Sequence, residues 1–129
     1  MSALTLAGVV AAHHACAQPY PNKPIRMIVP YPPGAGTDFT AREIGKAIGE
    51  ALGQPVVMDH RPGVAAVLGH GMAAKAAPDG YTLGLGTTGL LATMPHVKTG
   101  RLRLLGIGHT QRIKLTPDIP AINETVPGY

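Results

Sequence analysis

The sequence predicts an α/β fold, namely a three-layer, doubly wound and mostly parallel sheet. Strand-like runs alternate with helix-like runs three times within about seventy residues, a spacing typical of parallel sheets with crossover helices. The strand-like runs are short and apolar, which is typical of strands buried on both faces. Loops with glycine or proline follow these runs, as at Pro30–Asp38.

The first strand is predicted at Ile25–Val29, which ends in the apolar run Met-Ile-Val. The loop Pro30–Asp38 follows, with the sequence Pro-Tyr-Pro-Pro-Gly-Ala-Gly-Thr-Asp. Its prolines fix φ and remove N–H donors, while Gly34 and Gly36 permit a tight turn and a close approach of the backbone.

A helix is predicted over Phe39–Leu52, because apolar residues recur there at three- and four-residue spacing. This stripe comprises Ile44, Ala47, Ile48, Ala51 and Leu52. The helix can begin near Thr37, or near Thr40, where Thr40 and Glu43 fit a capping box. Gly53 is expected to end it.

Two further repeats follow. Val56–Met58 predicts a second buried strand, residues 59–63 a loop, and Val64–Ala77 an alanine-rich helix. Tyr81–Leu85 predicts the third strand, which leads into a loop at residues 86–89.

The remaining chain has a different character. Pro95–Thr99 is expected to form a helical turn or to end a helix, and Arg101–Ile107 alternates as a strand would. Thr116–Tyr129 is expected to be extended or turn-like, with one short helical turn within Asp118–Val126.

The loops at residues 30–38, 59–63 and 86–89 would share the carboxyl edge of the sheet, where ligands of such folds bind. The N–H groups of a helix start have no partners within the helix, and they favour anions together with the helix dipole. A carboxylate or phosphate site at the glycine loop is one hypothesis, and an ordinary strand-to-helix turn is the other. Asp38 would cap the helix start or contact a ligand amine or hydroxyl.

Composition excludes several classes. The 129 residues suffice for one domain, and the net charge of +4 comes from scattered Lys and Arg, so nucleic-acid binding is not expected. The chain lacks the third glycine of a dinucleotide fingerprint and lacks a Gly-Lys-Ser/Thr phosphate loop. We predict no enzyme activity, no cofactor and no metal. Four histidines lack metal-ligand spacing and acidic partners in the sequence, and we expect them to be surface or packing residues: His60, His70, His96 and His109.

Residues 1–17 have the pattern of a secretory signal peptide, with a short apolar run and Ala15-Cys16-Ala17 as a cleavage site. No Lys or Arg precedes the apolar run, so the n-region is missing or the true start lies upstream. An uncleaved, buried N-terminal helix is the alternative. Cleavage would remove Cys16, the one cysteine, and with it any disulfide or thiol chemistry.

Several motifs together resemble one known family. They are Pro24–Asp38, Ala51–Val57, Arg61–Gly63, Ala73–Leu83, Gly86–Thr87, Pro95–Leu105, Pro117–Pro120 and Val126–Tyr129. In this order they resemble the extracytoplasmic solute receptors of tripartite tricarboxylate transporters, the Bug family.

The resemblance implies one lobe of a type II periplasmic binding protein, located in the periplasm. Such receptors close two lobes on a small carboxylated ligand and hand it to a membrane permease. The ligand-binding residues that it implies are Gly34, Ala35, Gly36, Thr37, Asp38, Thr87, Thr88 and Gly89.

The chain also departs from this pattern. Gly89 is followed within six residues by Pro95, so residues 18–129 are expected to form a single α/β lobe with an internal deletion near 89–95. The segment that follows the Pro-Gly-Tyr motif in the family is expected to be missing as well. Ala65–Val67 and His60 replace residues that the family favours in the second loop. Weak or lost ligand binding follows, and the alternatives are a non-functional remnant or a small stand-alone interaction domain.

Overall fold

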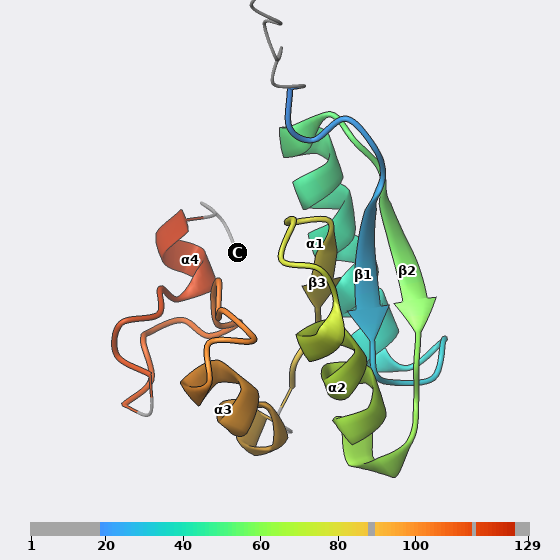
Figure 1. The fold of residues 1–129 in the computed structure, drawn as a ribbon. Helices are drawn as coiled ribbons and strands as arrows, with labels where there is room; N and C mark the ends of the chain where they lie inside the picture. Colours follow the sequence, from blue (N-terminus) through green and yellow to red (C-terminus); the bar gives the residue numbers. More distant parts are fainter. Residues whose placement is uncertain (1–18, 88–89, 115, 126–129) are drawn as a thin grey trace, which may run out of the picture.

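The computed structural model describes residues 19–87, 90–114 and 116–125. In chain order the elements are β1 (Ile25–Val29), α1 (Gly36–Leu52), β2 (Val56–His60), the 3₁₀ turn η1 (Val64–Ala66), α2 (Val67–Lys75), β3 (Thr82–Gly84), α3 (Leu90–Lys98) and α4 (Ile122–Thr125) (Figure 1). The predicted signal peptide lies outside the described residues.

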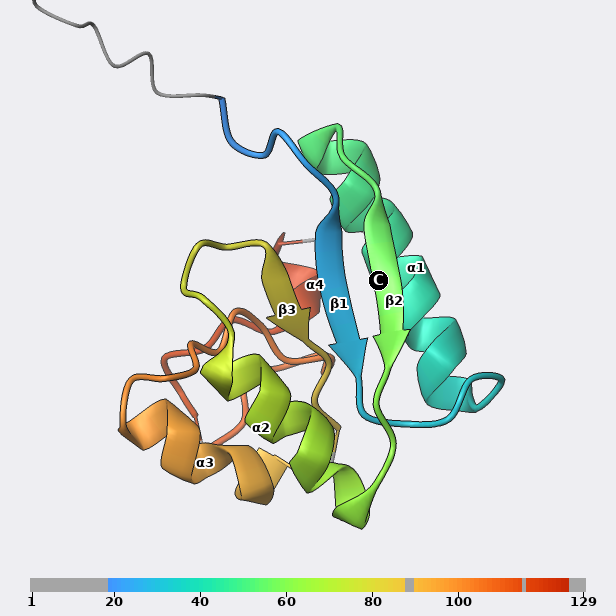
Figure 2. The ribbon, with the colours of Figure 1, turned by 45° about the vertical axis from the view of Figure 1, so that its right-hand side comes forward.

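The three strands form a parallel sheet in the order β2-β1-β3. In the register, Ile25 lies opposite Val56 and Arg26 opposite Thr82. Helix α1 packs on β1 and β2, while α2 packs on β1 and β3, and the two helices cover opposite faces of the sheet (Figure 2). The predicted three-layer, doubly wound architecture is therefore confirmed.

Strand β1 is central, and its side chains fill both inner layers. Met27 and Val29 are buried against Ala41 of α1. Side chains alternate along a strand, so Ile28, which is also buried, points to the α2 side with its register partner Gly84. The apolar run at the end of β1 was correctly predicted as a strand buried on both faces.

Strand β2 differs from its prediction in length and in burial. It extends to His60, so Asp59 and His60 belong to the strand rather than to a loop. As an edge strand it has one partner, and Val57 remains 53% exposed. Arg26 and Arg61 both form ion pairs with Asp59 on this outer part of the sheet. Apolar composition alone could not distinguish an edge strand from a central one.

The starts of the two large helices compare differently with the predictions. Helix α1 begins at Gly36, in agreement with the predicted start near Thr37, whereas the capping box at Thr40 is wrong because the Thr40 hydroxyl instead donates to the Gly36 carbonyl at 3.1 Å. Helix α2 begins at Val67 rather than Val64. Before it, Val64, Ala65 and Ala66 have φ values of 46°, 50° and 73°. Residues other than glycine are strained in this left-handed region of φ and ψ.

The predicted strand Arg101–Ile107 is wrong. The N–H groups of Arg101 and Leu102 donate to the carbonyl of His96 and so complete the end of α3, while Ile107 forms an isolated bridge to Ala121. The last turn of α3, over Pro95–Lys98, and the short helix α4 agree with the sequence predictions.

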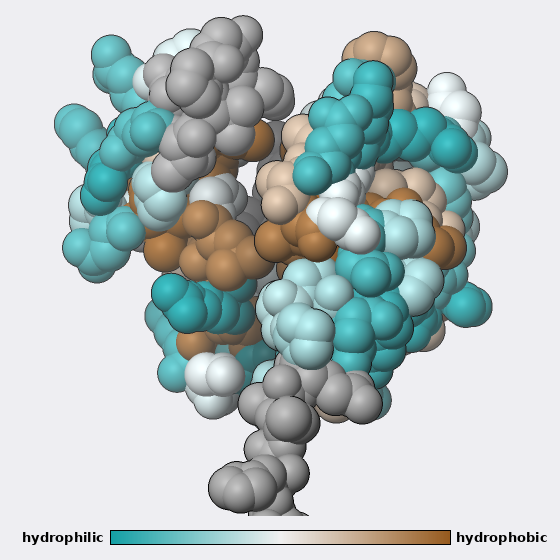
Figure 3. Space-filling view, turned by 90° about the horizontal axis from the view of Figure 1, so that it is seen from above, coloured by the Kyte–Doolittle hydropathy of each residue, from teal (hydrophilic) through white to brown (hydrophobic). Residues whose placement is uncertain are grey.

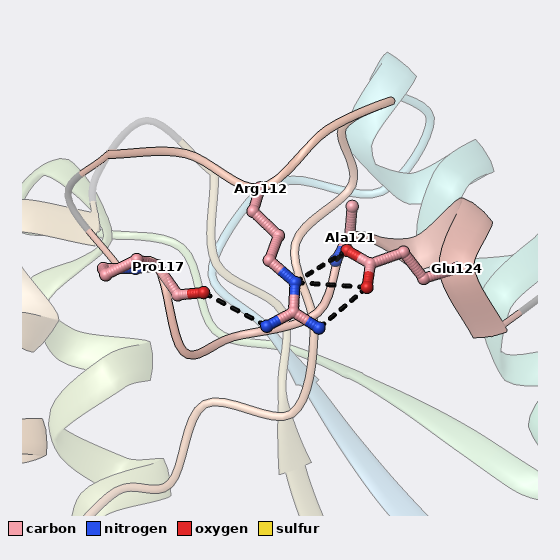
Figure 4. Close-up of polar contacts among 4 residues, drawn as sticks. All are labelled: Arg112, Pro117, Ala121 and Glu124. Atoms are coloured by element: carbon pink, nitrogen blue, oxygen red, sulfur yellow. Dashed lines mark hydrogen bonds and ion pairs between the residues drawn. The ribbon is translucent and has the colours of Figure 1, made fainter.

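Arg112 links the segment between Ile107 and Ala121 to helix α4 through hydrogen bonds (Figure 4). Its Nε and Nη2 atoms donate to the Glu124 carboxylate at 2.9 and 2.8 Å, and Nη1 donates to the Pro117 carbonyl at 3.2 Å. The Ala121 N–H donates to the same carboxylate at 2.9 Å. Arg112 and this N–H lower the pKa of Glu124 to about 2.

Hydrophobic side chains gather where the C-terminal segment faces the sheet, whereas the outer flanks in this view are largely hydrophilic (Figure 3). Among the described residues, no helix combines the length and apolar character that a membrane span requires.

Replacing Gly69 with alanine should destabilise the fold by about 1–3 kcal/mol, since overpacking forces the backbone to shift. A Cβ at this position would lie 2.7 Å from the Pro30 Cβ atom and 3.2 Å from the Arg61 carbonyl oxygen. Gly71→Ala is the matched control, because its Cβ would meet open space in the same helix. It should stabilise by about 1 kcal/mol. Urea unfolding of both variants measures the difference, and equal stabilities would contradict the packing described here.

Replacing Ala65 with glycine should stabilise the chain by about 0.5–1 kcal/mol, because glycine removes the left-handed strain at a small entropic cost. Ala65 is exposed, so little buried surface is lost. Ala51→Gly, in the right-handed last turn of α1, should instead destabilise by about 1 kcal/mol. Thermal unfolding compares the two variants, and a loss of stability in Ala65→Gly would refute the strain at this turn.

Candidate functional site

Three loops meet at the carboxyl edge of the sheet. The first follows β1, the second follows β2 and the third follows β3. Tyr31 of the first loop shares a hydrogen bond with Thr87 of the third, and His60 at the end of β2 contacts Asp38. The chain leaves β1 toward α1 and β3 toward α3, which packs with α2 on the opposite face. This point is the topological switch point, where α/β sheets bind ligands.

The glycine loop presents open donors at this edge. Gly34 adopts a φ of +85°, and Ala35 precedes the helix in an extended conformation. The N–H groups of Asp38 and Phe39 donate to the Ala35 carbonyl at 2.9 and 3.3 Å. The N–H groups of Gly36 and Thr37 have no acceptor within the described part of the chain. The arrangement therefore leaves two backbone donors at the positive end of α1.

The Thr37 hydroxyl adds a third donor. Its Oγ1 atom is buried and has no hydrogen-bond partner among the described residues. A buried hydroxyl without a partner costs free energy, so such a group marks a place where a ligand or a water would bond.

Asp38 does not cap the helix start in the usual way. Its Oδ2 atom accepts the N–H of Gly34 at 2.8 Å, while Oδ1 lies 2.9 Å from His60 Nε2 and 3.0 Å from Arg42 Nε. The expectation that His60 has no acidic partner is wrong, since the fold brings together residues that are 22 positions apart. The carboxylate thus joins the first loop, α1 and β2.

These contacts determine the charge at the site. The N–H of Gly34, with further contributions from His60 and Arg42, outweighs the effect of burial and lowers the pKa of Asp38 to about 2. Asp38 is therefore anionic at neutral pH and holds the N–H of Gly34. Of the predicted site residues, Gly36 and Thr37 keep open donors, whereas Gly34 and Asp38 satisfy each other.

The third loop is described in part. Thr87 lies at the site through its contact with Tyr31, whereas the predicted residues Thr88 and Gly89 lie outside the described residues. The sequence prediction missed Tyr31 and His60. Their positions were the available signal, because His60 is the last residue of β2 and Tyr31 lies two residues after the end of β1.

Among the described histidines, His70 is the buried one, with 4% of its surface exposed. A Cβ on Gly86, in the third loop, would lie 3.8 Å from its Cε1 atom. Burial, together with the nearby His96, lowers the pKa of His70, which is neutral at pH 7. In the described residues, no three His, Cys, Asp or Glu side chains lie close enough to hold a metal ion.

Replacing Asp38 with asparagine should remove part of the acid sensitivity of the fold. The folded-state pKa of about 2 lies below the ordinary value of 3.8, so Asp38 stabilises the fold above about pH 4 and loses this effect as the pH falls toward 2. Unfolding in urea at pH 6 and pH 3 should show a smaller decrease for Asp38→Asn than for the unmodified chain. Glu43→Gln, an exposed carboxylate of the same helix, is the control. An unchanged decrease in Asp38→Asn would disprove the assignment.

Comparison with known proteins agrees with the resemblance seen in the sequence. Residues 40–97 match the family described as tripartite tricarboxylate transporter family receptor. The BugT protein of Bordetella pertussis is 46% identical over 80 residues, which cover 62% of this chain and 24% of that protein. A second protein of the same organism, described as a UPF0065 protein, is 40% identical over 93 residues, covering 72% of this chain and 29% of that protein.

Two solved structures are also similar to part of this chain. R. palustris Rpa4515 with adipate is 35% identical with a TM-score of 0.53, over 56% of this chain and 24% of that chain. A TctC solute binding protein from Polaromonas is 34% identical with a TM-score of 0.54, over 67% of this chain and 29% of that chain. The chain spans less than a third of the length of these relatives. Over the region that these comparisons match, it belongs to the family of tripartite tricarboxylate transporter receptors.

Proposed function

We propose that this chain binds a small carboxylate at the glycine loop, as one lobe of a periplasmic receptor. The observation that carries the proposal is the pair of open N–H groups of Gly36 and Thr37 at the switch point, beside the buried Thr37 hydroxyl, which has no partner among the described residues. A carboxylate is acceptor-only and anionic, so it matches both the donors and the positive end of α1. The predicted residues Ala35, Thr88 and Gly89 remain part of this proposal.

The relatives support the choice of ligand and of setting. The family is one of receptors for tripartite tricarboxylate transporters, and the R. palustris relative was solved with adipate. We extend these properties to this chain: an acid with one or more carboxylates, a location in the periplasm, and a membrane permease as the partner that receives the ligand.

The proposed affinity is low. The donors lie on exposed or half-buried residues of a single lobe, so water and salt compete with each charge-assisted hydrogen bond. The charge of Asp38 adds repulsion, which Arg42 offsets in part. An internal deletion near residues 89–95 remains a prediction. It would remove the surface that encloses the other side of the ligand.

Gly36→Val tests the site. Its side chain would project into open space, so the fold should persist, while its bulk should shield the adjacent N–H groups and abolish carboxylate binding. Titration calorimetry with adipate, citrate and succinate measures the affinity, and circular dichroism measures the helix and sheet content. Gly71→Val is the matched control, as a second helical glycine with open space around it.

Binding by the control but not by Gly36→Val is the expected result. Equal binding by both variants would place the site elsewhere. A folded chain that binds none of the three acids would favour the alternatives, namely a remnant without a ligand or a stand-alone interaction domain.

A further inference from the structure

Two hydroxyl groups form a bridge across the switch point. The side chains of Tyr31 and Thr87 share a hydrogen bond that joins the first loop to the third, across 56 positions of sequence. Both groups are partly buried. The ring of Tyr31 packs against the core formed by Met27, Val29 and Ala41, so its hydroxyl is held by the same cluster that supports β1.

A count of hydrogens shows that this pair has a donor to spare. Each hydroxyl carries one hydrogen and two acceptor lone pairs. The bond between Tyr31 and Thr87 uses one of the two hydrogens, whichever group donates. Within the described residues neither hydroxyl has another partner, so one hydrogen remains for an acceptor from outside this part of the chain. A hydroxyl that already accepts a hydrogen bond is also a stronger donor.

We infer that Tyr31 and Thr87 act as one donor unit, which gives the remaining hydrogen to the carboxylate that the glycine loop binds. The inference rests on the proposed function and adds Tyr31 to the predicted ligand-binding residues. The pair and the Thr37 hydroxyl supply donors of the same kind from the first and third loops. An acceptor-only ligand suits this arrangement, whereas a cationic ligand does not.

The test is adipate titration of the full chain and four variants: Tyr31→Phe, Thr87→Val, the double variant and Thr87→Ser. Removing the hydroxyl that faces the ligand removes one charge-assisted hydrogen bond, and removing the other leaves that donor without the partner that orients it. Each single variant should therefore bind adipate about three- to tenfold more weakly at this partly exposed site. The double variant should bind no more weakly than the weaker single variant, because both changes disrupt one unit. Thr87→Ser keeps the hydroxyl and should retain binding.

Tyr20→Phe is the matched control. The Tyr20 hydroxyl donates to the Gly80 carbonyl at 2.8 Å, before β3 begins, so its removal costs one hydrogen bond away from the site. It should leave the adipate affinity unchanged. Melting temperatures separate an effect on binding from an effect on folding. Tyr31→Phe and Tyr20→Phe should each melt within about 2–4 °C of the unmodified chain.

The outcomes distinguish the two proposals. If the unmodified chain binds adipate and Tyr31→Phe binds equally well, the donor unit is refuted and the glycine-loop site stands. If the double variant loses adipate affinity by the product of the two single fold losses, the two hydroxyls make independent contacts, and this result would also refute the donor unit. A folded, unmodified chain that binds no carboxylate would overturn both proposals.

Discussion

Strand β1 is paired on both edges by parallel neighbours, and this arrangement fixes the position of nearly every other part. Its side chains alternate between the α1 layer and the α2 layer. The glycine loop follows its carboxyl end and therefore lies at the centre of the sheet edge. Because β1 lies in the middle, the loops that follow β2 and β3 arrive on either side of it. The candidate site is thus a direct consequence of strand order.

Local patterns made much of this fold predictable. The apolar end of β1, the periodicity of α1 and the glycine that ends it each depend on neighbours in sequence. The errors arose where distant residues decide. Val57 looks as apolar as Ile28, and only the strand order makes one exposed and the other buried. Arg101–Ile107 alternates as a strand does, but its first N–H groups complete the end of α3.

The site was predictable to a similar extent. The open N–H groups of Gly36 and Thr37 follow from a glycine loop that leads into a helix. The pairing of Asp38 with His60 and that of Tyr31 with Thr87 link different loops, and no single motif contains both partners. The candidate site consequently combines open N–H donors with the carboxylate of Asp38. Arg42 and His60 contact this carboxylate and offset its negative charge in part.

One contact within the glycine loop spans a very short stretch of chain. Gly34 and Asp38 are four residues apart, so closing this turn costs little chain entropy, whereas pairing β1 with β3 joins Arg26 to Thr82, 56 residues away. Contacts of short range form early and long-range parallel pairing forms late. During folding, the glycine loop can therefore acquire its shape before the sheet edge that carries it is complete.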